Sequence, residues 1–184
     1  SLAMGLTFHG ILASAIGDRE VALARLEEAV KIQERIGDYE GLGVALSGKA
    51  QLAMGAGDLD EAVRLYEGAK EAMVTVGDHA EVARIMDEMA WCTLAAGQVD
   101  RARGLFLGSL QAHDLVASTR GIGLALFGLS AVEVADDRAD RGAVIAAAAE
   151  GFSEAEGVVV AYPWVTAAQE EVAAALLRLP PEEL

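Results

Sequence analysis

The chain contains few of the residues on which secreted, catalytic and nucleic-acid-binding proteins commonly depend. Its 184 residues include one cysteine, three histidines, three prolines and no asparagine, and only 5% are aromatic. Cys92 alone cannot form an internal disulfide, and a free thiol is typical of a reducing compartment, so we expect a cytoplasmic protein. Lysine and arginine number 14 against 29 acidic residues, which gives a formal net charge of −15. Because phosphate binding needs a basic face, we expect no direct nucleic-acid partner.

Long apolar segments are also missing from the sequence. No apolar run approaches the roughly 18 residues of a membrane-spanning helix, so we expect no membrane partner. The chain does not open with a basic stretch followed by an apolar core, as a signal peptide would. It begins with Ser1 instead of methionine, so we expect it to be a processed or excised piece.

What the chain does have is a repeat of 40 residues without insertions or deletions. One set of helix breaks falls at Gly17, Gly57, Gly97 and Asp137, and a second set falls at Gly37, Gly77, Ala117 and Gly157. Glycine suits the left-handed position that ends a helix, and aspartate suits the N-cap of the next one. Three further positions are always small (Gly10, Ala50, Ala90, Ser130; Ala22, Ala62, Ala102, Gly142; Ala29, Ala69, Ser109, Ala149). This self-similarity indicates a solenoid whose repeats share one core.

The small–bulky–small pattern of Leu46, Ala50, Ala62, Tyr66 and Ala69 resembles the tetratricopeptide repeat (TPR). The spacing is closer to the HEAT range of about 40–47 residues than to the tetratricopeptide period of about 34. The positions of the small residues are nevertheless stronger evidence for the tetratricopeptide repeat than the spacing is for HEAT, because small residues set how closely helices approach. The Gly-Asp breaks resemble the long TPR repeats of bacterial MalT-like and LuxR-type regulators and of actinobacterial transcriptional regulators. The resemblance implies an all-α, TPR-like solenoid.

The expected architecture is a single superhelical domain over residues 1–184. Its repeats are expected at 1–40, 41–80, 81–120 and 121–160, followed by a terminal segment at 161–184. Helices are expected over 2–16, 19–36, 39–56, 59–76, 79–96, 99–116, 119–135 and 138–156. Pro163 suits the first turn of a last, capping helix over 163–179. Gln98 is expected to be a weaker N-cap than the aspartates, and Ser118 or Thr119 is expected to cap the helix that follows.

A helical wheel assigns two faces to the first helix of each repeat. The positions of Leu2, Leu6 and Ala13 are expected to form the core stripe. The positions of Met4, Thr7, Phe8, Ile11 and Ala15 are expected on the opposite side, which lines the concave groove of a tetratricopeptide array. The expected groove residues are Phe8, Ile11, Val44, Gln51, Arg84, Asp87, Glu88, Trp91, Leu124, Phe127 and Trp164.

Four of these groove residues are aromatic, which is more apolar surface than a solvated face usually exposes. We therefore predict that the groove binds an apolar or amphipathic segment of a protein or peptide. Asp87 and Glu88 are expected on the groove beside Arg84. As neighbours in a helix, these two acids point about 100° apart and cannot easily share a proton.

The sequence predicts no enzyme, no cofactor and no metal site. Residues 43–50 nearly match the phosphate loop, but Ala50 replaces the hydroxyl that would bind a metal, and the stretch lies within an expected helix. The histidines His9, His79 and His113 lack the spacing of a helical metal site. The groove also lacks the lysine and asparagine set with which chaperone-binding tetratricopeptide domains hold a peptide carboxylate.

Two functions remain open on these observations. The first is a scaffold that binds a protein or peptide, as the sensory or interaction region of a bacterial signalling or transcription regulator. The alternative is a domain that senses a small-molecule inducer held in the groove. The first helix offers Leu2, Leu6, Ala13 and Ile16 at an end without a polar cap, and the groove adds Phe8 and Trp91. These apolar residues predict a homodimer.

Overall fold

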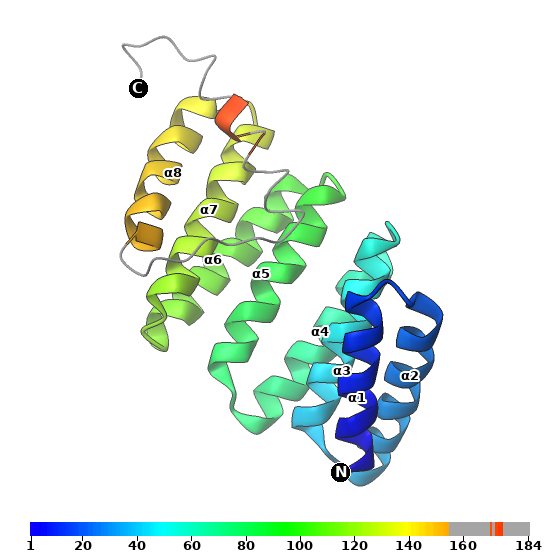
Figure 1. The fold of residues 1–184 in the computed structure, drawn as a ribbon. Helices are drawn as coiled ribbons and strands as arrows, with labels where there is room; N and C mark the ends of the chain where they lie inside the picture. Colours follow the sequence, from blue (N-terminus) through cyan, green and yellow to red (C-terminus); the bar gives the residue numbers. More distant parts are fainter. Residues whose placement is uncertain (155–169, 171, 175–184) are drawn as a thin grey trace.

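The structure is a computed structural model that describes residues 1–154, 170 and 172–174. Helices follow one another along the chain as α1 (Leu2–Ala15), α2 (Arg19–Ile36), α3 (Tyr39–Gly55), α4 (Leu59–Val76), α5 (His79–Ala95), α6 (Val99–Leu115), α7 (Thr119–Ala135) and α8 (Ala139–Glu154) (Figure 1). The prediction of an all-α solenoid is confirmed, and these helix ends lie within two residues of the expected ones. The expected last helix lies outside the described residues except at 170 and 172–174, which are helical.

Side-chain caps begin most of the helices. Four aspartates each accept a hydrogen bond from the backbone N–H three residues later (Asp18, Asp38, Asp58 and Asp78). Gln98 makes no such bond, as expected, and Ser118 caps α7 by accepting from Gly121 N at 3.2 Å. Ala117 and Asp137 adopt φ angles of 52° and 56° where earlier repeats use glycine. The last two repeats therefore have less favourable turns than the first two.

The odd-numbered helices form the inner layer of the array. Close backbone contacts join α1 to α3 and α5 to α7, whereas no comparable contacts join one even-numbered helix to another in the described part of the chain. The even-numbered helices therefore lie on the outer side. One inner pair is an exception, because the described parts of α3 and α5 lack the close contacts of the other two pairs, and the two helices lie apart in Figure 1.

The core follows the bulky position of the second helix in each repeat. Leu26, Tyr66 and Phe106 are fully buried, as the repeat pattern predicted. Leu26 and Phe106 each face the first helix of the next repeat, where a small residue makes room for the side chain. A Cβ atom on Gly48 would lie 3.2 Å from Leu26 Cδ2, and one on Gly128 would lie only 2.2 Å from Phe106 Cε1. The small positions thus set the distance between successive repeats.

The predicted core stripe of the first helices is partly wrong. Leu2, expected in the core, is 72% exposed. Thr7, expected on the groove, is fully buried and accepts a hydrogen bond from Gln33 Nε2 at 3.2 Å. The buried stripe of α1 consists of Ala3, Thr7, Gly10 and Ala13. The true core face is therefore rotated from the expected one, because it centres on the contact with the second helix of the same repeat.

Gly128→Ala tests this packing. The added methyl group would overlap the Phe106 ring, so we expect a loss of about 1–3 kcal/mol of unfolding free energy in urea denaturation. Gly104→Ala is the matched control, because nothing lies within 4 Å of its added Cβ. That control should gain up to about 1 kcal/mol from helix propensity. Equal effects of the two substitutions would contradict the packing described here.

Candidate functional site

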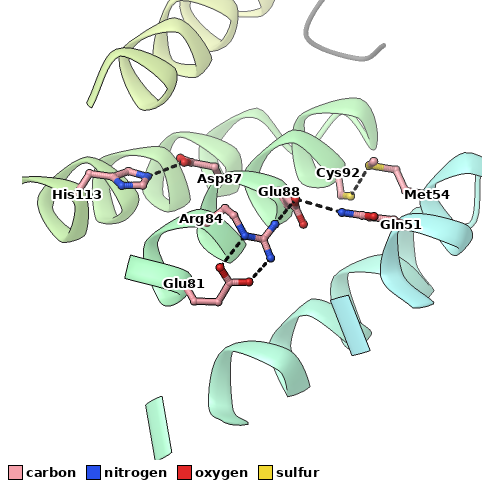
Figure 2. Close-up of polar contacts among 8 residues, drawn as sticks. All are labelled: Gln51, Met54, Glu81, Arg84, Asp87, Glu88, Cys92 and His113. Atoms are coloured by element: carbon pink, nitrogen blue, oxygen red, sulfur yellow. Dashed lines mark hydrogen bonds and ion pairs between the residues drawn. The ribbon is translucent and has the colours of Figure 1, made fainter. Parts of the chain in front are cut away.

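A stripe of charged residues runs along α5. Glu81, Arg84 and Glu88 follow each other at the spacing that brings side chains to one helix face. Arg84 Nε donates to Glu81 Oε2 at 2.8 Å, Nη2 contacts the other oxygen of Glu81, and Nη1 donates to Glu88 Oε1 at 2.5 Å. Gln51 Nε2 donates to Glu88 Oε1 at 3.4 Å from α3 (Figure 2). This α5 stripe therefore bridges the two inner helices that lack close backbone contact.

The α5 stripe departs from the chain's own repeats. The equivalent residues of α3 and α7 are uncharged (Gly41, Val44 and Gly48; Gly121, Leu124 and Gly128). Where glycine stands at the last of these positions, the bulky residue opposite it is apolar, as Leu26 and Phe106 are. Where Glu88 stands there, the residue at the opposite position is Tyr66. The polar pair is thus confined to the middle one of these three junctions, and the residues 80 positions before the stripe are uncharged.

Burial dominates the electrostatics of Glu88 and Tyr66. Glu88 is only 6% exposed, and this burial raises the pKa of its carboxyl group against the opposing charge of Arg84. Burial also raises the pKa of Tyr66, and the charge of the nearby Glu88 raises it further. The side-chain hydrogen bond between Tyr66 and Glu88 adds to the rise in the pKa of Tyr66 and opposes the rise in the pKa of Glu88. The two buried groups therefore satisfy each other.

Asp87 lies outside the α5 stripe, contrary to its expected place on the groove. Its Oδ2 lies 2.8 Å from His113 Nε2 of α6, and both side chains are buried (Figure 2). Burial raises the pKa of Asp87, while the contacts with His113 and Ser109 oppose that rise. Gly121 leaves space for the histidine ring, because a Cβ there would lie 2.0 Å from His113 Nδ1. Asp87 therefore joins the two helices of its own repeat.

The expected open aromatic groove is also corrected. Trp91 is 8% exposed and packs edge-on against Phe106, with ring centroids 5.1 Å apart. Phe127 lies 5.9 Å from Trp91 between ring centroids and is half-buried. Phe8 is 57% exposed, and Trp164 lies outside the described residues. Two of the expected groove aromatics therefore contribute to the core among α5, α6 and α7.

The remaining expected groove residues are half-buried on the inner helices. They are Ile11, Val44, Gln51, Arg84 and Leu124. The structure thus brings Gln51, Arg84 and Glu88 together at one place, with apolar side chains on the helices to either side. It separates Asp87 and Trp91 from them.

A second buried charge cluster was missed in the sequence. Glu133 of α7 is 3% exposed and is paired with Arg103 of α6 and with Arg138, whose Nε lies 2.6 Å from Glu133 Oε2. The hydrogen bond from Arg138 lowers the pKa of Glu133 despite desolvation. The sequence did contain a sign of this cluster, because Glu133 stands at the repeat position that Ala13 and Ala53 occupy in the first two repeats, and both alanines are buried. Because its charge is matched by arginines, this cluster fixes the α7–α8 turn.

Cys92 lies in the core of the described part of the chain. Cys92 is fully buried, its Sγ lies 3.2 Å from Met54 Sδ, and burial raises the pKa of the thiol to about 12. Such a thiol stays protonated at neutral pH. Within the described residues, no three His, Cys, Asp or Glu side chains are placed to hold a metal ion. None of the described helices has the length and apolar character needed to cross a membrane.

Comparisons with known proteins agree with this fold. Residues 41–114 match the family model of the tetratricopeptide repeat. No curated protein matches the sequence. The crystal structure of BtubC (BKLC) from P. vanneervenii is similar with a TM-score of 0.73 and 18% identity, over 91% of this chain and 69% of that one.

Two crystal structures of a kinesin-light-chain-like protein of P. anserina, with nearly identical TPR-like repeats, are also similar. One has a TM-score of 0.69 and 18% identity over 96% of this chain and 87% of that one. The other has a TM-score of 0.68 and 17% identity over 94% and 84%. Residues 41–114 thus carry tetratricopeptide repeats, and the chain has a TPR-like solenoid fold.

The raised pKa of Glu88 predicts a pH dependence of stability. A carboxyl group whose pKa is higher in the folded state stabilises the fold while protonated, and this contribution is lost as the pH rises through that pKa. We expect the unfolding free energy to fall as the pH rises above the ordinary glutamate value of 4.5. Glu88→Gln should reduce this slope in urea titrations at a series of pH values. A variant with the wild-type slope would contradict the account.

Proposed function

We propose that this chain is a non-catalytic module that binds a segment of a protein or peptide along its inner helices. Tetratricopeptide repeats generally mediate interactions between proteins, and residues 41–114 match that family. The observation that carries the proposal is the partial exposure of Val44, Arg84 and Leu124 at equivalent positions of α3, α5 and α7. They present one accessible row across three successive inner helices. Such a row suits an extended or helical segment that crosses several repeats.

The wider setting of the module is also a proposal. The Gly-Asp breaks between the helices resemble those in long tetratricopeptide arrays of bacterial regulators. We infer that the chain serves as the sensory or interaction region of a signalling or transcription regulator. Its partner would then be another segment of the regulator or a protein that controls it.

Selection from a displayed library of random peptides tests binding to the inner row. Peptides selected on the wild-type chain should bind at least about tenfold more weakly, or about 1.4 kcal/mol, to Val44→Ser or Leu124→Ser. Val74→Ser is the matched control, because Val74 is 58% exposed on the outer helix α4. Thermal melts would establish that each variant is folded. Failure to select any peptide, or equal losses for all three variants, would contradict the proposal.

We also propose that two copies associate through α1. Three apolar side chains of α1 (Leu2, Phe8 and Leu12) and that of its C-cap residue, Ile16, are more than half exposed. The residues equivalent to Leu12 in the later repeats, Leu52, Cys92 and Val132, are buried. The surface of α1 is thus of the kind that packing between repeats covers elsewhere in the chain. Repeat arrays with such an uncovered end tend to be poorly soluble.

Sedimentation measures this association. Salt screens the net charge of −15 over about 8 Å at physiological ionic strength, so distant charges oppose contact only weakly. We expect association at micromolar concentration and a weaker interaction for Leu12→Asp or Phe8→Asp. Val74→Asp adds the same charge to α4 and should leave the association unchanged. A strictly monomeric wild-type chain at high concentration would contradict the dimer.

A further inference from the structure

We infer that two copies of this chain pair α1 with α1 in antiparallel directions, so that His9 of each copy lies over Gly5 of the other. Leu2 of each copy then lies opposite Leu12 of the other. This inference rests on the proposed association through α1, and it specifies which residues meet and in which direction the two helices run.

The exposed residues of α1 have the spacing of a helix-pairing seam. Leu2, Gly5, His9 and Leu12 are all exposed and are separated by three, four and three positions. Such an alternation places residues on one face of a helix, and it is the spacing with which the helices of coiled coils meet. These four residues, the α1 seam, therefore form a surface that a second helix can cover.

The later repeats show that the same positions are normally covered. The residues equivalent to Gly5 are fully buried in each later repeat (Ala45, Ile85 and Ala125). Two of the three residues equivalent to His9 are buried as well (Met89 and Leu129). In α1 these positions are exposed. The α1 seam thus has a place in the repeat that packing fills elsewhere in the chain.

The lack of charge on α1 favours a second copy as the occupant. Every other described helix contains aspartate, glutamate, lysine or arginine, whereas α1 contains none of them. A partner with a charged surface would find no complementary charge on this helix. Two copies with a net charge of −15 repel each other through most of their surfaces, but α1 brings no like-charged side chains of its own into contact. The same helix in a second copy is therefore a suitable partner.

The α1 seam is complementary to itself when the two helices run in opposite directions. Positions 2 and 12 are centred on position 7, and so are positions 5 and 9. An antiparallel pair centred there places each leucine opposite a leucine and each histidine opposite a glycine. A parallel pair would place His9 against His9 and Gly5 against Gly5. That arrangement would crowd two imidazole rings and leave a gap between the glycines.

The chain already packs a histidine ring over a glycine. His113 of α6 fills the space that a side chain at Gly121 of α7 would occupy. Nothing lies within 4 Å of a Cβ atom placed on Gly5, so the corresponding space on α1 is open. Gly5 can therefore receive the imidazole of His9 from a second copy as Gly121 receives that of His113.

Cross-linking through introduced cysteines tests the direction of the pairing. A mixture of Leu2→Cys and Leu12→Cys chains should form a disulfide-linked pair on mild oxidation, because opposed positions can reach the Cβ separation of about 3.5–4.5 Å that a disulfide needs. Either variant alone should remain unlinked, because positions 2 and 12 lie about 15 Å apart along a helix. The wild-type chain is the matched control, since its Cys92 is fully buried.

Sedimentation of Gly5→Leu tests the fit within the α1 seam. The added side chain would occupy the space for His9 of the second copy, so we expect association to weaken at least about tenfold. A contact that depended on apolar area alone would instead become stronger. Gly104→Leu is the matched control, because Gly104 is exposed on α6 with nothing within 4 Å of its added Cβ. It should leave the association unchanged, and thermal melts would establish that both variants are folded.

Two results would overturn this arrangement and leave association through α1 standing. They are a disulfide between two Leu2→Cys chains, and association of Gly5→Leu at least as strong as that of the wild-type chain. A strictly monomeric wild-type chain, with no linked pair in the mixture, would overturn both proposals. Binding of a peptide along the inner helices is measured separately and does not depend on either result.

Discussion

Close approach between successive repeats is the constraint on which the structure depends. Leu26 of α2 and Phe106 of α6 each lie against a glycine of the first helix of the next repeat. Without a side chain at Gly48 or Gly128, the backbones of these helices can share a dense core. The low aromatic content follows from the same requirement. Alanine, glycine and leucine fill most of the narrow spaces between the helices.

The candidate site is where this constraint is relaxed. Glu88 replaces the glycine, and Tyr66 replaces the apolar residue at the opposite position. The described parts of α3 and α5 then lack the close backbone contacts found between α5 and α7. Arg84, Glu81 and Gln51 occupy the junction as a hydrogen-bonded group (Figure 2). A polar junction is thus obtained by changing a few positions of a repeat while the rest of the array keeps its packing.

The sequence predicted the helices and the bulky core position well, because glycine and aspartate breaks recur at fixed spacing. It predicted the faces less well. A wheel built on one helix cannot tell whether the small residues face the partner helix or the groove, so Thr7 and Asp87 were placed on the wrong side. Trp91 was misplaced because its burial depends on α6 and α7. The difference between residues 81–88 and their equivalents at 41–48 and 121–128 was visible in the sequence, but its meaning depends on the contact between Glu88 and Tyr66.

The central claim is that the residue at position 88 and its neighbours on α5 set the distance between α3 and α5. A crystal structure of the chain with Glu81→Gly, Arg84→Leu and Glu88→Gly, which gives α5 the residues of α7, tests it most directly. The account predicts that α3 and α5 move into close backbone contact, as α5 and α7 do in the present structure. An unchanged separation of α3 and α5 in that variant would contradict it.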